Sequence, residues 1–157
     1  MRGITIMDRQ PDSNRLAVNL IDILEQLGSA IATTEWKISD VECIGQEADL
    51  LHEISDTQRI VSGITLLQIA RNIIQVIDGT FAGYQINKSE PWIIIEAVDS
   101  SAYDVDSNEE TILTKLRQRF INVENLPESE TQPTETQSIQ SGSPATSAPM
   151  PILGVRK

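Results

Sequence analysis

The sequence has a single cysteine, Cys43, and a single histidine, His52. A lone cysteine excludes an intramolecular disulfide framework, which favours a reducing compartment. A lone histidine excludes the HExxH zinc motif that His52 and Glu53 begin, because Asp56 stands where the second histidine is needed. The chain also lacks a signal-peptide pattern, and no apolar run approaches the roughly 18–20 residues that a membrane span needs. We therefore expect a cytoplasmic protein without a membrane span.

Basic residues are scarce as well. The chain has 12 Lys and Arg against 23 Asp and Glu, which gives a formal net charge of −11. The basic residues are scattered along the sequence, whereas phosphate contacts need them clustered. The sequence therefore predicts no nucleic-acid binding. Its acidity has two explanations, solubility or attraction to a basic protein partner, and both stay open at this stage.

The composition changes abruptly after Leu126. Residues 1–126 have the apolar periodicity of a single α+β domain, which is long enough to bury an ordinary core. Residues 127–157 are rich in Pro, Ser, Thr, Gln and Glu, and predict a disordered tail that cannot bury enough surface to offset the entropy of ordering. Ile152 and Leu153 lie near its basic end. They indicate a short partner-binding motif, a segment that docks on its own domain, or a neutral terminus.

The periodicity within the domain predicts a small antiparallel sheet of about three strands covered by three to four helices. Runs of β-branched and aromatic residues predict strands at residues 34–44, 80–86 and 92–98. Apolar residues spaced three and four apart predict helices at residues 14–27, 46–55, 64–77 and 108–121. Two segments allow more than one interpretation. Residues 73–77 also fit a strand, and residues 1–13 fit either an edge strand or a mobile terminus.

Four local patterns refine this fold. The polar loop at residues 87–90 is too short for a crossover, so the strands on either side should form an antiparallel hairpin. Residues 92–98 are apolar at both parities, which predicts a central strand covered on both faces with Ile94 in the core. Ser39 and Asp40 break the alternation of their strand and predict a bulge. Ser107 and Glu110 have capping-box spacing at the start of the last helix.

An acidic stretch before that helix resembles part of a calcium loop. Asp104, Asp106 and Asn108 match the first three ligand positions of an EF-hand. The match then fails, because Glu109 replaces the required glycine and Lys115 replaces the bidentate glutamate. We interpret the stretch as a turn followed by a helix start, and we expect no metal site.

The sequence has no recognisable catalytic or cofactor motif. Cys43 lies in an apolar strand pattern, and a buried cysteine is usually an inert small hydrophobe. Ser100 follows a strand but has no G-x-S-x-G surroundings. Residues 79–83 contain two glycines without the spacing of a phosphate-binding loop. We therefore expect no bound cofactor.

Two stretches resemble known sequences. The segments IIQVIDGTFAGYQ, at residues 73–85, and PWIIIEAVDSSAYDVDSNEE, at residues 91–110, are similar to small uncharacterised proteins common in cyanobacterial genomes. The resemblance covers roughly residues 34–125. It implies a cytoplasmic accessory protein and brings no site residue, ligand or activity.

These observations favour a non-enzymatic, acidic interaction or accessory protein that binds a protein partner, as an inhibitor, an immunity-type protein or an assembly factor does. The candidate partner-binding residues are Asp99, Asp104, Asp106, Trp92, Ile152 and Leu153. Trp92 has a second interpretation as a core residue, because large aromatics serve both in cores and at interface hot spots.

Two alternatives stay open. One is a small carboxylate-using hydrolase or transferase with a site near Asp99 and Asp104. The other is a subunit of a homo-oligomer that associates through a sheet edge or the tryptophans. A deep pocket with convergent polar groups of shifted pKa would favour the enzyme, whereas a flat acidic face would favour binding.

Overall fold

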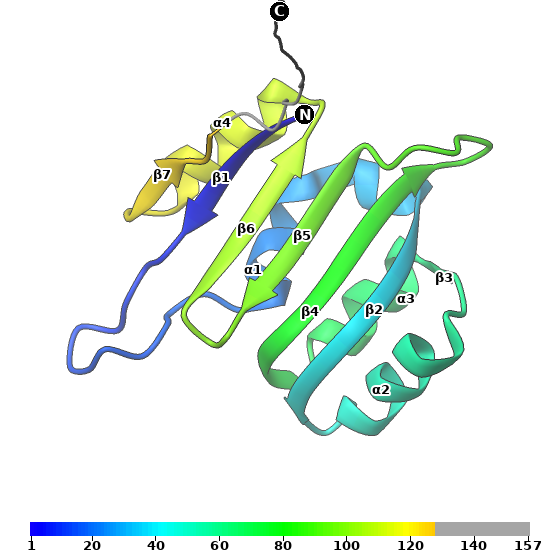
Figure 1. Ribbon diagram of the computed structural model, residues 1–157, viewed down its shortest axis with the longest axis horizontal. Helices are drawn as coiled ribbons and strands as arrows, with labels where there is room; N and C mark the ends of the chain where they lie inside the picture. Colours follow the sequence, from blue (N-terminus) through cyan, green and yellow to red (C-terminus); the bar gives the residue numbers. More distant parts are fainter. Residues whose placement is uncertain (128–157) are drawn as a thin grey trace, which may run out of the picture. The chain divides into compact units, whose positions relative to one another are not determined.

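The structure, a computed structural model, describes residues 1–127 and is built around one antiparallel β-sheet of seven strands (Figure 1). The strands are β1 (Arg2–Ile6), β2 (Thr34–Gly45), β3 (Val61–Ser62), β4 (Ile73–Gln85), β5 (Ile93–Val98), β6 (Ala102–Ser107) and β7 (Val123–Asn125). Their order across the sheet is β3-β2-β4-β5-β6-β1-β7, with every neighbouring pair antiparallel. The predicted tail, including Ile152 and Leu153, lies outside the described residues.

The helices pack on one face of this sheet. They are α1 (Leu20–Leu24), the 3₁₀ helix η1 (Glu25–Thr33), α2 (Ala48–Thr57), α3 (Gly63–Ala70) and α4 (Glu110–Arg119). Figure 1 shows α1, α3 and α4 behind the sheet and α2 beside the edge strand β2, while the front face of the sheet carries no helix within residues 1–127. Within residues 1–127, the predicted α+β class with three to four helices is confirmed, with four α-helices present, but the sheet has seven strands instead of about three. No helix in this part of the chain is long and apolar enough to cross a membrane.

The core lies between the helices and the inner face of the sheet. Successive side chains of a strand point to opposite faces. On β5, Ile93 and Ile95 are fully buried towards the helices, whereas Ile94 is only half-buried on the other face. The prediction that β5 is covered on both faces with Ile94 in the core is therefore wrong. The other strands add a matching set of buried residues, namely Ile4, Ile6, Trp36, Ile38, Phe81, Tyr103 and Val105.

The predicted helix at residues 64–77 is in fact two elements. Helix α3 starts after Ser62, whose Oγ accepts the backbone N–H of Thr65 at 3.1 Å, and it ends at Ala70. Strand β4 begins at Ile73, and its pairing with β2 extends over nearly its whole length. The strand interpretation of residues 73–77 is confirmed. The ladder with β2 outweighs the local helical spacing, which β-branched residues support only weakly.

The first predicted helix begins later than residue 14. Helix α1 starts at Leu20, and the backbone N–H of Asn19 donates to Asp22 Oδ2 at 2.9 Å at its N-terminus. The helix then tightens into η1, which is kinked at Gly28, where φ is 60° and ψ is −136°. The apolar spacing that suggested a start near residue 14 included Leu16, which belongs to the preceding loop.

Two strands that the sequence interpretation missed or left open lie in the middle of the sheet's second half. Strand β1 pairs with both β6 and β7, so it is an interior strand instead of an edge strand or a mobile terminus. Strand β6 occupies the stretch interpreted above as a turn. Its Tyr103 and Val105 point inwards and its Asp104 and Asp106 point outwards, which gives a strand alternation in an acidic sequence.

Other local predictions are confirmed. Strands β4 and β5 form the predicted antiparallel hairpin, with Phe81 opposite Ile95. The bulge in β2 lies where expected, because the register with β4 shifts between Ser39 and Glu42 and Asp40 has a φ of 56°. Helices α2 and α4 lie within about two residues of their predicted limits.

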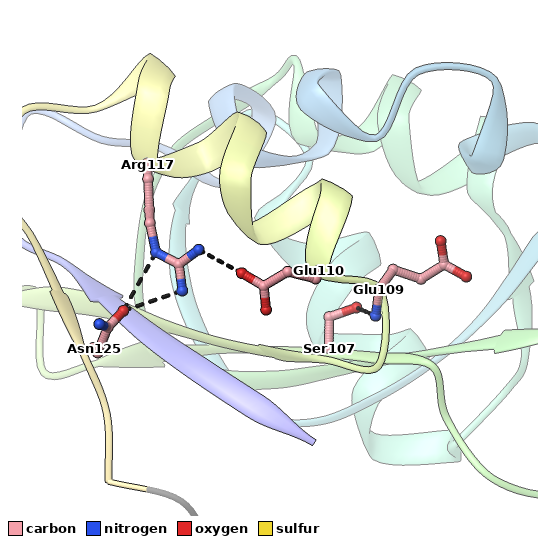
Figure 2. Close-up of polar contacts among 5 residues, drawn as sticks. All are labelled: Ser107, Glu109, Glu110, Arg117 and Asn125. Carbon is pink, nitrogen blue, oxygen red and sulfur yellow. Dashed lines mark hydrogen bonds and ion pairs between the residues drawn. The ribbon is translucent and has the colours of Figure 1, made fainter.

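Polar contacts hold α4 against the sheet (Figure 2). The Oγ of Ser107 accepts the backbone N–H of Glu109 at 3.0 Å. The predicted capping box is otherwise wrong, because the Glu110 side chain bonds Arg117 Nη1 at 2.7 Å instead of a backbone N–H at the helix start. Arg117 also donates from Nε and Nη2 to Asn125 Oδ1, at 3.3 and 3.1 Å. This arginine therefore ties the edge strand β7 to α4.

The opposite edge of the sheet is protected by α2. Strand β3 covers only two residues of β2, which continues beyond it. Along that continuation, Val41 N–H donates to Ser55 Oγ at 3.2 Å, and Cys43 N–H donates to His52 Nε2 at 3.3 Å. Side chains of α2 thus satisfy donors that a neighbouring strand would otherwise take. They blunt an edge that would be open to pairing with another chain.

The two faces of β5 predict opposite outcomes for neighbouring substitutions. Ile95→Asp should unfold the protein, because an unpaired buried carboxylate costs several kcal/mol, comparable with a domain's whole stability of about 5–15 kcal/mol. Ile94→Asp, the matched control, should keep a cooperative thermal transition because its side chain reaches solvent. Circular dichroism melts of both variants check this. Loss of folding in Ile94→Asp would show that the second face is covered.

Candidate functional site

The face of the sheet without helices carries a group of carboxylates. Glu96 on β5 and Asp104 on β6 are direct cross-strand partners. Asp106 lies two residues further along β6 and therefore on the same face. We call Glu96, Asp104 and Asp106 the acidic patch. Like charges at neighbouring cross-strand positions repel and destabilise a sheet, so the fold gains nothing from this arrangement.

Asp106 bears the clearest sign of this repulsion. Partial burial, together with the negative charges of Asp104 and Glu96, raises the pKa of the Asp106 carboxyl above its usual 3.8, and the N-terminal ammonium opposes the shift in part. Gly3 stands opposite Asp106 on β1. A Cβ at this glycine would collide with Asp106 Oδ1. The missing side chain at Gly3 thus provides the space in which the carboxylate lies.

The structure brings some of the predicted acidic residues together and separates another. Asp104 and Asp106 share the acidic patch, whereas Asp99 lies in the turn between β5 and β6, where its φ is 48° and its N–H donates to Asp78 Oδ1 at 2.9 Å. Glu96 completes the patch and was missed by sequence reasoning. Its position on β5 places its side chain on the same face as Ile94. That placement brings it next to Asp104 only once β6 is recognised as the neighbouring strand.

Trp92 is a core residue in the structure. Its side chain is only 7% exposed, and its indole Nε1 donates to Thr34 Oγ1 at 3.2 Å. The carbonyl oxygen of Trp92 also accepts the Ser107 hydroxyl at 2.9 Å. Its ring is therefore not presented to a partner, and we leave it out of the candidate surface.

A groove lies on the same open face, over β2 and β4. It comprises two adjoining clefts of about 500 and 270 Å³, which share Lys37, Ile60 and Tyr84 in their walls. The ammonium of Lys37 sits 5.2 Å from the centre of the Tyr84 ring. Ile60 is 53% exposed beside them. We call the site formed by these three residues the Tyr84 groove. It offers apolar and aromatic surface next to a cation.

The cysteine and histidine meet, but not in a catalytic arrangement. Cys43 Sγ lies 3.8 Å from His52 Nε2. Burial, with a contribution from the Asp49 charge, raises the pKa of the Cys43 thiol to about 11, so the thiolate needed for nucleophilic attack is scarce at neutral pH. His52 Nε2 already accepts the backbone N–H of Cys43. The hydrogen bond between these two residues covers the edge of β2, so the role of the pair is structural.

A polar cleft of about 410 Å³ lies at the N-terminal end of β4, near the turn between β5 and β6. Its polar lining includes Gln10, Arg15, Asn19, Gln75 and Ser100. Among residues 1–127, the three groups with clearly shifted pKa are Cys43, Tyr103 and Asp106, and none of them lines this cleft or the Tyr84 groove. The feature that would favour the hydrolase hypothesis, a pocket of polar groups with shifted pKa, is thus not formed by these clefts.

The EF-hand-like residues do not form a loop. Asp104 and Asp106 belong to strand β6, which is paired on both sides, and Asn108 follows the strand directly. Within residues 1–127, no group of three or more His, Cys, Asp or Glu side chains has the geometry to hold a metal ion. The acidic patch is thus a surface of separate carboxylates.

The raised pKa of Asp106 predicts a pH-dependent stability effect. The folded state binds this proton more tightly than the unfolded state, so ionisation of Asp106 destabilises the fold as pH rises through the folded pKa. Asp106→Asn should therefore raise the melting temperature near pH 7. It should leave it unchanged near pH 3, where both states are protonated. Calorimetry at both pH values checks this, with the exposed Asp12→Asn as control. A lower melting temperature near pH 7 would contradict the repulsion inferred for the patch.

Comparison with known proteins gave no match among family models, curated proteins or solved structures. The resemblance to small cyanobacterial proteins and the cytoplasmic location stay predictions.

Proposed function

We propose that this protein binds a basic segment of a partner protein through the open face of its sheet. The observation that carries the proposal is the acidic patch, in which Glu96, Asp104 and Asp106 stand side by side on a face without helices in the described part of the chain. Burial and mutual repulsion keep the Asp106 pKa high. A Lys or Arg side chain placed among these carboxylates would relieve that repulsion.

Physical chemistry supports a protein partner with a cationic segment. Complementary charge steers encounter and sets register between proteins, and the net charge of −11 extends the attraction beyond the patch itself. The same charge opposes contact with nucleic-acid phosphates. An inhibitor, an immunity-type protein and an assembly factor would each use such a surface.

A homo-oligomer formed through this face, as distinct from one formed through a sheet edge or the tryptophans, is disfavoured. A two-fold dimer places the same surface against itself, so two acidic patches would meet and repel. The enzyme alternative gains no support from the two aspartates that suggested it, because Asp99 lies in a turn and Asp104 lies on the outer face of a paired strand, apart from one another. Neither alternative has a described feature that favours it over binding.

Affinity capture from cells of the source organism tests the proposal. Three baits are compared: the wild type, a patch variant, and a control variant with the same change of net charge. The patch variant combines Glu96→Gln, Asp104→Asn and Asp106→Asn. The control combines Asp12→Asn, Glu25→Gln and Asp56→Asn, which are exposed positions in a loop and on helices.

We expect a protein partner with a basic segment that the wild type and the control retain and the patch variant loses. Loss of three charge-assisted contacts should weaken binding at least about 100-fold, because each hydrogen bond to a charged group contributes roughly 1.5–3 kcal/mol. Binding of the wild type should also weaken as salt rises, through screening. Equal capture by the patch and control variants would argue against the open face as the binding surface.

A further inference from the structure

Resting on the proposed function, we infer that the partner segment crosses the strands in an extended conformation from the Tyr84 groove to the acidic patch. An apolar side chain of the partner occupies the groove, and its basic residues reach the carboxylates. The partner's recognition motif is therefore bipartite, with a fixed spacing between an apolar anchor and a cationic end.

The register of the sheet defines the path. Lys37, Ala82, Ile94 and Asp106 are successive cross-strand partners on β2, β4, β5 and β6. They form one row that runs from the Tyr84 groove to the acidic patch, perpendicular to the strands. The groove and the patch are thus two ends of one continuous line on the open face.

The length of that row sets the spacing. Neighbouring strands lie about 4.8 Å apart, so the three steps from Lys37 to Asp106 span about 14 Å. An extended segment advances about 3.3 Å per residue and covers this distance with about four residues. A helix, at about 1.5 Å per residue, would need about nine.

The floor of the path favours the extended form. Ala82 contributes only a methyl group, between the larger Tyr84 and Thr80 on the same face of β4. An extended chain fits in a depression one residue wide. A helix of about 10–12 Å diameter would rest on the side chains of Tyr84 and Thr80. Ile94, half-buried in the middle of the row, offers an apolar contact to the segment as it passes.

Charge distinguishes the two ends. At the groove, Lys37 and Lys88 line the walls together with one carboxylate, Glu35, so the lining carries a net positive charge and is a poorer place for a cationic side chain. At the far end, Glu96, Asp104 and Asp106 attract one. A segment laid in the reverse direction would place its cations against the lysines. The row therefore selects the orientation as well as the spacing.

The inference is tested by titrating the full-length protein into fluorescently labelled synthetic peptides. Each peptide has a Trp anchor, a Gly/Ser spacer and a Lys-Arg-Lys end, and the spacer has one, four or nine residues. Anisotropy titrations give the affinities. The four-residue spacer should bind at least about five-fold more tightly than the one-residue spacer, which is too short to engage both ends at once, whereas the flexible nine-residue spacer can still reach both.

Variants of the protein locate the two ends. Ile60→Ser should remove the advantage of the four-residue spacer, whereas Ile121→Ser, at a position that is 94% exposed in the turn between α4 and β7, should preserve it. The patch variant should weaken all three peptides. If the peptides bind in a patch-dependent way without a spacer preference, the crossing path is wrong while the proposed function stands. If no peptide depends on the patch, the proposed function fails too.

Discussion

Burial on one side only is the constraint on which the rest of this structure depends. No described helix covers the front face of the sheet, so every interior strand has to present its apolar residues at one parity and solvent-compatible residues at the other. Ile93 and Ile95 meet this requirement on β5, and Tyr103 and Val105 meet it on β6. The second face is then free to carry residues that contribute nothing to the core.

The residues on that free face include charges whose placement is unfavourable for stability. A sheet surface needs only solubility, which mixed charges supply at little cost to stability. Here, Glu96 faces Asp104 and Asp106 lies over Gly3, so the chain accepts repulsion that a single substitution would remove. Natural proteins tend to depart from locally favourable choices at functional sites. The acidic patch is such a departure, and the Tyr84 groove adds exposed apolar surface on the same face.

The sequence predicted elements whose signal is local and missed those that depend on distant pairing. The β4–β5 hairpin, the bulge near Asp40 and helix α4 follow from neighbouring residues. Strand β6 did not, because Asp104 and Asp106 have low strand propensity and only pairing with β5 and β1 makes them extended. The candidate site was accordingly half predicted. Asp104 and Asp106 were named, while Glu96 and the Tyr84 groove require the strand order of the sheet.

The cover that α2 places over β2 has a consequence for selectivity. A bare strand edge offers backbone hydrogen bonds that almost any extended peptide can accept, so it recruits partners without reading their side chains. Here Ser55 and His52 already occupy the donors of Val41 and Cys43. Growth of the sheet by further strands is blocked along this stretch. In the proposed binding mode, recognition would then depend on charge and shape on the open face, which discriminate between related sequences.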